Sequence, residues 1–261
     1  MDGTRWMEPD GAAPRTRPPM NEHDARANLI LGMLPPGAYQ RIAPHLQAVS
    51  LRAGEVLFSP ETDAPLQAIH FLAGPIVSFD HVLGDSEHHT RLVPSVAITG
   101  REGVAGVELF LGGQTAINRA TVRVGGAALR LQADPLRHEF ARGTVLQRLL
   151  LGAADALLSQ IAYNSACERL HTPTQRLVRW LLLVDDRALQ RELPLTQETL
   201  AQFMGLRRES VSLAARQLQG AGLIRYSRGH LAILDRDGLL ARSCICYTQI
   251  KARYDATLAA G

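Results

Sequence analysis

Residues 197–216 read Gln-Glu-Thr-Leu-Ala-Gln-Phe-Met-Gly-Leu-Arg-Arg-Glu-Ser-Val-Ser-Leu-Ala-Ala-Arg, and this stretch decides the fold. Ala201 is small enough to let two helices cross closely, and Gly205 tolerates the left-handed backbone that a tight turn between them requires. Thr196 stands where a capping side chain is needed, ahead of the first helix. The stretch therefore predicts a helix-turn-helix, with its second helix over residues 207–219.

The segment that follows extends this motif. Gly220 and Gly222 end the second helix, and two short apolar runs within 223–234 flank Ser-Arg-Gly at 227–229, which is a hairpin signal. A helix-turn-helix followed by a hairpin is a winged helix. The alternative is an ordinary helical hairpin in a core, but the basic hairpin and the outward residues of the second helix favour a surface for DNA. Those outward residues are Arg208, Glu209, Ser212, Leu213 and Arg216.

Composition indicates a soluble protein of more than one domain. The chain has 261 residues, of which 46% are hydrophobic, enough for two cores and an accessory segment. Its apolar runs, such as 149–151 and 181–184, are too short to span a bilayer, and residues 1–20 lack the apolar stretch of a signal peptide. Three cysteines without framework spacing favour a reduced, cytoplasmic setting with no membrane.

Charge is distributed unevenly along the chain. Residues 172–261 carry 13 Lys and Arg against 8 Asp and Glu, whereas residues 1–171 carry 15 against 17. The positive part contains the helix-turn-helix, as contact with phosphates requires.

The pattern along the chain predicts an α+β protein. We expect a mobile tail at 1–26, a jelly-roll-like antiparallel β-roll at 27–141, a dimerisation helix at 142–171, a winged helix at 172–240 and a C-terminal helix at 241–261. Pro173 discourages a helix through Thr172 and so marks a hinge. Short β-like runs punctuated by Gly and Pro fall at 55–58, 68–72, 76–81, 92–98, 119–124 and 128–132.

The predicted dimerisation helix carries an apolar stripe at intervals of three or four residues. Such a stripe packs against a second copy of itself or, alternatively, against the chain's own β-domain. Asn164 continues the stripe, either as a polar position that sets the register of the seam or as a half-exposed residue. The interface residues are Leu146, Leu150, Ala153, Leu157 and Ile161.

This order of elements resembles the CRP/FNR superfamily of bacterial transcription regulators. The resemblance covers residues 28–240 and is strongest at 195–201 and 207–211, within the helix-turn-helix. One branch of the family is similar at the hinge, where residues 170–182 include Gln175, Arg176 and Trp180, and at Cys-x-Cys-Tyr, here 244–247. The resemblance implies a homodimer that binds double-stranded DNA at a palindromic operator and works with RNA polymerase.

The resemblance also implies which residues contact DNA. Arg208, Glu209 and Ser212 match the base-reading positions of the recognition helix. Leu213 replaces a base-contacting Arg of many members and can touch only apolar features such as a thymine methyl. Arg207 stands where the helix usually opens with Ser or Thr, so we interpret it as a phosphate contact, together with Arg228 on the wing.

The β-roll of this superfamily binds a small effector, which in some members is cyclic AMP. The corresponding pocket here contains Gly106, Glu108, Asn118 and Arg119. In our alignment Asn118 takes the place of the phosphate-binding Arg, so we expect no response to cyclic AMP and leave the effector unknown. A shift by one residue would instead place Arg119 at the phosphate.

Other sensor chemistries have weaker signatures. No Cys precedes Cys167, which argues against an oxygen-sensing iron–sulfur cluster. We interpret His70, His81, His88 and His89 mostly as solvated loop residues and predict neither haem nor a metal site. If Cys244 and Cys246 lie on one helix, their side chains diverge by about 200°, so packing is favoured over a redox pair.

An enzyme and a module that binds protein partners are the two other classes of function to consider for this sequence. An enzyme on a cupin-like β-roll needs a compact His/Glu metal set or a nucleophile with its base, and neither His-x-His with Glu nor Gly-x-Ser-x-Gly occurs. An effector-binding module that acts through protein partners is the remaining alternative. The outward residues of the second helix favour DNA, so we predict a regulator and no enzyme.

Overall fold

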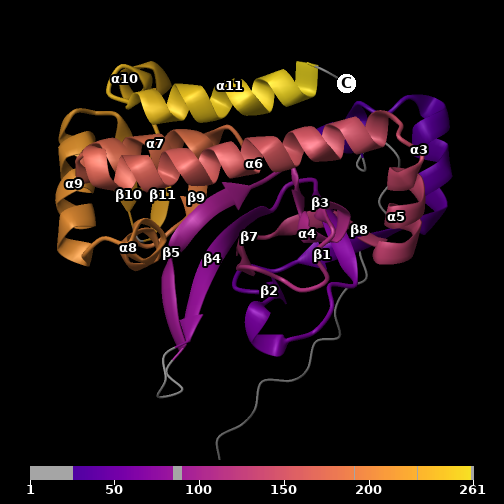
Figure 1. Cartoon of the computed structure of the whole chain (residues 1–261). Coiled ribbons are helices and arrows are strands. Elements are labelled where there is room, and N and C mark those ends of the chain that lie inside the picture. The colour runs from indigo at the N-terminus through magenta and orange to yellow at the C-terminus, as the bar shows by residue number, and fades with distance from the viewer. Residues whose placement is uncertain (1–25, 85–89, 191, 228, 260–261) are drawn as a thin grey trace, which may run out of the picture.

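The structure, a computed structural model, describes residues 26–84, 90–190, 192–227 and 229–259. A β-roll and a winged helix lie side by side, and one long helix runs along both of them (Figure 1). The predicted tail lies almost wholly outside the described residues.

The β-roll consists of two antiparallel four-stranded sheets. Apolar side chains fill the space between them, and this core includes Leu72, Val77 and Val122. One sheet has the order β1 (Leu46–Leu51), β8 (Gly126–Gln132), β3 (Ala68–Leu72) and β6 (Val104–Ala105). The other has the order β2 (Val56–Phe58), β7 (Arg119–Val124), β4 (Ile76–Gly84) and β5 (Thr90–Thr99).

All six predicted strands are present, and β3 and β7 have the predicted bounds. Strands β1 and β6 were not predicted. β1 is an edge strand with only one buried residue, Leu51, and so lacks the alternation that marks a half-buried strand. β6 has only two residues.

Helices cover one end of the β-roll and join it to the rest of the chain. Short helices α2 (Leu29–Gly32), α3 (Pro36–Ile42) and η1 (Ala43–His45) precede the first strand, and η2 (Pro60–Thr62) and α4 (Glu108–Leu111) lie between strands. After the β-roll come two helices, α5 (Ala133–Ala141) and α6 (Val145–Leu170), of which α6 falls within the predicted dimerisation helix at 142–171. Gly143 separates them with a φ of +67°, which a continuous helix cannot contain.

The winged helix begins at α7 (Pro173–Asp185), capped by Thr172 in a capping box with Gln175. Three short strands, β9 (Glu192–Pro194), β10 (Ile224–Ser227) and β11 (His230–Ile233), form a sheet of order β10-β11-β9. Helices α8 (Gln197–Met204) and α9 (Arg208–Gly220) complete the domain. Its apolar core continues into Ile76, Ile98 and Val124 of the β-roll, so the two parts share one packed cluster.

The predicted C-terminal helix is α11 (Ile245–Ala259), which begins four residues later than expected and is preceded by the short helix α10 (Arg236–Leu240). α11 lies along α6 in Figure 1. Gly152 permits this close approach, because a Cβ there would lie 2.6 Å from Cγ2 of Thr257. By length and composition α6 is the one described helix that passes as a membrane span, but it packs against the β-roll and α11 as a core helix does.

Candidate nucleic-acid interface

The helix-turn-helix is built as its sequence predicts. The hydroxyl of Thr196 accepts the backbone N–H of Thr199 at 3.0 Å and caps α8. Gly205 ends that helix in the left-handed region with φ +58°. Ala201 is buried at the crossing of α8 and α9. Most of the predicted inward residues are buried, and only Leu206 is partly exposed: Leu200, Met204, Val211 and Leu218 lie in the core.

The outward face of α9 is exposed and carries several charged side chains. Arg207, Arg208, Glu209 and Arg216 are exposed, and within the described part of the chain none of them forms a salt bridge. Arg207 is the N-cap of α9 and makes no side-chain capping bond, in agreement with a side chain directed elsewhere. Leu213 is 53% exposed on the same face. Three arginines and one glutamate of α9 and its N-cap thus face solvent, where a ligand can contact them.

Ser212 is the exception on this face. It is half-buried, and its hydroxyl donates to Oε1 of Gln197 at 2.6 Å. The bond connects α9 to the first turn of α8 and fixes the angle between the two helices. A base contact from Ser212 therefore competes with this bond.

The wing is the hairpin β10–β11, and its turn contains Gly229 with φ +80°. Arg228, which we expect to contact phosphate, lies outside the described residues. At the base of the wing Arg225 forms a 2.6 Å ion pair with Glu192 on β9. The hydroxyl of Tyr226 donates to the carbonyl of Leu195, and burial raises the pKa of this tyrosine. These contacts hold the wing against the start of α8.

The apolar stripe proposed for the dimer seam needs correction. Leu146, Leu150 and Ala153 are buried within one chain, against the N-terminal helices and the β-roll. Leu157 is 8% exposed and packs in the β-roll core with the partly buried Ile161. The alternative, a helix lying on its own β-domain, describes this face. A side chain already covered by its own chain has no surface left for a partner.

Asn164 has a different role from either expectation. Its Nδ2 donates to the carbonyl of Val96 on β5 at 2.7 Å, and its Oδ1 accepts from Arg179 of α7. It therefore connects the β-roll to the first helix of the winged helix.

A second row on α6 remains exposed. Its members are spaced by three and four residues, the spacing of a coiled-coil seam. Leu151 and Leu158 are its large apolar members, 43% and 61% exposed. The row consists of Arg148, Leu151, Asp155, Leu158, Ala162 and Ser165.

The structure does not bring the predicted effector residues to one ligand position. Glu108 is buried and has its pKa raised by that burial. Asn118 lies with its Oδ1 3.0 Å from Nδ1 of His81, and Arg119 forms an ion pair with Glu61. Gly106 has φ +103° and faces the backbone of Ala68, where a Cβ would lie 3.1 Å from the carbonyl oxygen. The side chains of Asn118 and Arg119 thus have different partners, His81 and Glu61.

The clustering of the cysteines was not predicted from the sequence. Cys244 precedes α11 and is not on a helix with Cys246, so the expected divergence of 200° does not apply. All three cysteines are buried in one cluster, and His171 adjoins it. The usable signal was the spacing of Cys167 and His171, four residues apart at the end of α6. Of the histidines weighed before, His88 and His89 lie outside the described residues.

Comparison with known proteins agrees with this geometry. Residues 175–242 match the model of the Crp-like helix-turn-helix domain. No relative among curated proteins matches the chain.

Solved structures share this fold over most of the chain. FixK2 from Bradyrhizobium japonicum is 17% identical, with a TM-score of 0.59, and the match covers 76% of this chain and 98% of that one. A putative transcriptional regulator of the CRP/FNR family from Eubacterium rectale is 14% identical, with a TM-score of 0.57, over 82% and 96% of the two chains. A putative cAMP-binding regulatory protein from Silicibacter pomeroyi is 21% identical, with a TM-score of 0.57, over 84% and 96%.

The class of protein follows from the fold and the site together. A β-roll, a long helix and a winged helix in this order form the CRP/FNR fold. Residues 175–242 match a Crp-like helix-turn-helix domain, and the chain as a whole has the fold of CRP/FNR regulators of known structure.

Proposed function

We propose that the protein is a cytoplasmic homodimer that reads a palindromic operator through α9 and is controlled by an effector in the β-roll. The observation that carries the proposal is the exposed row of charged side chains on α9, which forms no salt bridge with any described residue. Cations without an intrachain partner are available to phosphates and base edges, and forming such contacts breaks no salt bridge.

The residue chemistry assigns a contact to each position. Arg208 grips O6 and N7 of a guanine, and Glu209 accepts from a cytosine amino group. Leu213 touches a thymine methyl. Ser212 adds a polar base contact where its bond to Gln197 allows. Phosphate contacts come from Arg207, Arg216 and Arg228.

The exposed row on α6 is the dimer seam in this proposal. Two copies pack Leu151 and Leu158 against each other in a parallel pair across a two-fold axis. Asp155 already forms a 3.4 Å ion pair with Arg253 of α11, so the row keeps a charged partner within its own chain. A two-fold dimer places the two α9 helices in half-sites about one DNA turn, 10–10.5 bp, apart.

Control by an effector rests on contacts between the β-roll and the winged helix. The guanidinium of Arg123 on β7 lies 4.4 Å from the ring centroid of Phe203 on α8. A ligand that shifts β7 therefore shifts the first helix of the DNA-binding motif. A regulator bound at an operator acts on transcription beside the promoter, so RNA polymerase is the expected protein partner.

Operator selection from random DNA, followed by fluorescence anisotropy, tests the proposal. Arg208→Ala is expected to cost about 1–3 kcal/mol of binding free energy and to relax specificity at one base pair. Arg137→Ala, an exposed arginine on α5 of the β-roll, is the matched control and leaves affinity unchanged. Binding to random DNA is expected to fall steeply with salt. A flat salt dependence, or an unchanged operator preference in Arg208→Ala, would favour a module that acts through protein partners.

A further inference from the structure

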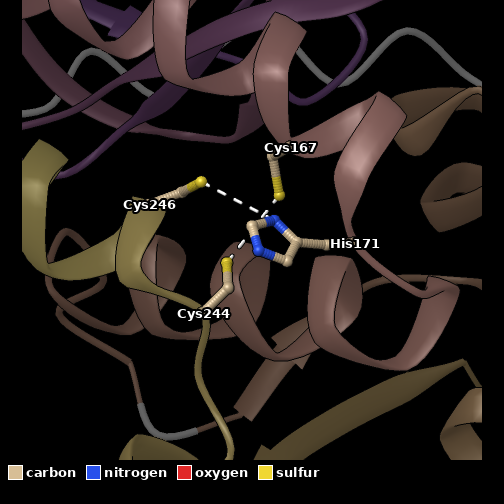
Figure 2. Close-up of side chains that lie close together, drawn as sticks. All are labelled: Cys167, His171, Cys244 and Cys246. Carbon is tan, nitrogen blue, oxygen red and sulfur yellow. Dashed lines mark hydrogen bonds between the residues drawn. The ribbon is translucent and has the colours of Figure 1, made fainter.

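Four metal-binding side chains meet at the junction of α6, the hinge and α11. Cys167 lies in the last turn of α6, and His171 is the C-cap residue of that helix. Cys244 immediately precedes α11, and Cys246 lies in its first turn. Figure 2 shows the three sulfur atoms gathered around the imidazole ring. Their ligand atoms all lie within 4.8 Å of one another, and no other such group occurs in the described part of the chain.

The distances fit a tetrahedral mononuclear ion. The sulfurs of Cys167 and Cys244 are 3.8 Å apart, and Sγ of Cys246 is 3.7 Å from Nδ1 of His171. A tetrahedral ion with Zn–S bonds of about 2.3 Å and a Zn–N bond of about 2.0–2.1 Å sets these edges at about 3.8 and 3.6 Å. These two distances are thus close to those of a coordinated site.

Ordinary packing does not account for this arrangement. All three cysteines are free thiols, with exposures of 0%, 4% and 3%. The contact of Cys167 is with Cys244 and that of Cys246 is with His171, so the four groups chiefly contact each other. The partly buried Tyr163 packs beside them. Four polarizable donors from two separate segments of the chain, directed at one point, are the arrangement of a coordination site.

The donor set identifies the class of metal. Three thiolates and one imidazole form a Cys₃His site, which is a frequent set for structural Zn²⁺ and is closed to further ligands. Soft thiolates disfavour Mg²⁺ and Ca²⁺, which take oxygen ligands. A cubane iron–sulfur cluster places each thiolate on a different iron atom and needs a wider cage than ligand atoms within 4.8 Å provide.

We propose that Cys167, His171, Cys244 and Cys246 form a Zn²⁺ site that clamps the hinge between the β-roll and the DNA-binding domain. His171 is followed directly by Thr172, the N-cap of α7, so an ion held there fixes the point at which the winged helix begins. The two cysteines of the C-terminal segment tie this point to α11, which is itself bound to α6 through the 3.0 Å hydrogen bond from Thr257 to the carbonyl of Gly152.

A consequence for DNA binding rests on the proposed function. Without the ion, the hinge loses the link between His171 and the start of α11, and the winged helix samples more orientations. Occupancy of the site by Zn²⁺ then affects operator affinity, because the ion stabilises one arrangement of the hinge over the others.

Metal content of the purified full-length protein is the first test. We expect about one Zn²⁺ per chain, and Co²⁺ substitution should give the intense visible bands and thiolate charge-transfer absorption of a tetrahedral site. Cys246→Ser and His171→Gln should each weaken binding by about 100-fold or more, since even an outer-shell partner is worth 10–100-fold. His45→Gln, an exposed histidine in η1, and Ser243→Ala, next to Cys244, are the matched controls and retain the metal.

His171→Cys separates coordination from packing. A fourth thiolate also binds Zn²⁺, so this variant should keep the ion and shift the Co²⁺ bands, whereas a merely structural histidine would give no such rescue. A folded apoprotein that shows no Zn²⁺ uptake and no Co²⁺ bands on titration would overturn the site, as would binding that survives both Cys246→Ser and His171→Gln.

Operator binding is the second test, and its result is interpreted independently of the metal-content measurement. Removal of Zn²⁺ under reducing conditions should weaken operator affinity by about tenfold, with recovery on adding Zn²⁺ but not Mg²⁺. Unchanged affinity in the apoprotein would overturn the clamp. A metal-loaded protein with no affinity for any DNA would contradict the proposed function and leave the metal stoichiometry as evidence for the site.

Discussion

Glu102 and Arg187 form an ion pair between the β-roll and the DNA-binding domain, with 2.7 Å between Oε1 and Nε and side-chain exposures of 9% and 3%. Glu102 lies in the turn between β5 and β6 and also accepts the backbone N–H of Gly100. Arg187 follows α7, donates to the carbonyl of Leu183 and lies 5.0 Å from the ring centroid of Tyr254 on α11. One guanidinium thereby connects three segments that are distant in sequence.

Breaking this pair from one side should destabilise the protein strongly. Glu102→Gln leaves the guanidinium of Arg187 buried without a counter-charge, at an expected cost of about 3–5 kcal/mol in the free energy of unfolding. Glu192→Gln is the matched control, because its pair with Arg225 is 56% and 60% exposed and is worth about 1 kcal/mol or less. Urea unfolding followed by tryptophan fluorescence measures both. If both variants lost the same free energy of unfolding, the burial of the Glu102–Arg187 pair would not be the cause of its contribution to stability.

The exposed row of α6 predicts how the protein assembles. Leu158→Glu places a charge at the centre of the proposed seam and should convert a dimer to a monomer at micromolar concentration without unfolding it. Leu234→Glu, at a leucine 56% exposed after β11, is the control and stays dimeric. Analytical ultracentrifugation measures the mass of each. A dimer that persists in Leu158→Glu would rule out this seam.

A charge in the buried stripe of α6 should act on stability instead of on dimerisation. Leu157→Asp puts a carboxylate into the β-roll core, so it should lower the unfolding free energy and not merely shift the oligomer equilibrium. Comparing Leu157→Asp with Leu158→Glu therefore distinguishes the face of α6 that is buried in its own chain from the face that is exposed to a partner.

Local signals explain what the sequence predicted well. Thr196 and Gly205 act within a few residues of themselves, so the helix-turn-helix was predictable from spacing alone. Periodicity shows that a helix has an apolar face but not what covers it. Leu157 and Leu158 are adjacent and chemically alike, and only the fold decides that one is 8% and the other 61% exposed.

Assembly of the metal-binding cluster was beyond sequence reasoning for another reason. Cys167 with His171 and Cys244 with Cys246 are two local pairs, and each alone is weak evidence of a site. They meet only because α11 returns along α6, a tertiary contact with no sequence signature. The helix break before Ile245 was also missed, and it is this break that lets both C-terminal thiols face the same point.

The effector region predicts no response to cyclic AMP. Arg119, the cation nearest to the expected phosphate position, forms an ion pair with Glu61, whose pKa is lowered by the Ser59 hydroxyl and by Arg119. A cyclic phosphate must displace this carboxylate, and loss of a charged hydrogen bond costs about 1.5–3 kcal/mol. Calorimetry with cyclic AMP and cyclic GMP up to about millimolar concentration should show no saturable heat. A micromolar isotherm that disappears in Arg119→Ala would instead assign the phosphate to Arg119.

Acid should destabilise the β-roll through His70. Burial, with the charge of Arg130 as a second cause, lowers the pKa of His70 to about 4, and its Nδ1 has no hydrogen-bond partner within the described residues. Because the folded pKa lies below the unfolded value of about 6.5, the folded state favours neutral imidazole. This contribution is complete above about pH 6.5 and is lost as the pH falls towards 4, by at most about 3 kcal/mol.

Unfolding free energies measured between pH 7 and 4.5 should therefore fall more in the wild type than in His70→Gln. The control, His45→Gln, removes an exposed histidine and keeps the wild-type slope. Parallel slopes in wild type and His70→Gln would mean that His70 takes up its proton without unfolding. In that case Arg130 and the surrounding strands must make room for two positive charges, and an NMR titration of the His70 ring should then give a midpoint near its ordinary value of about 6.5.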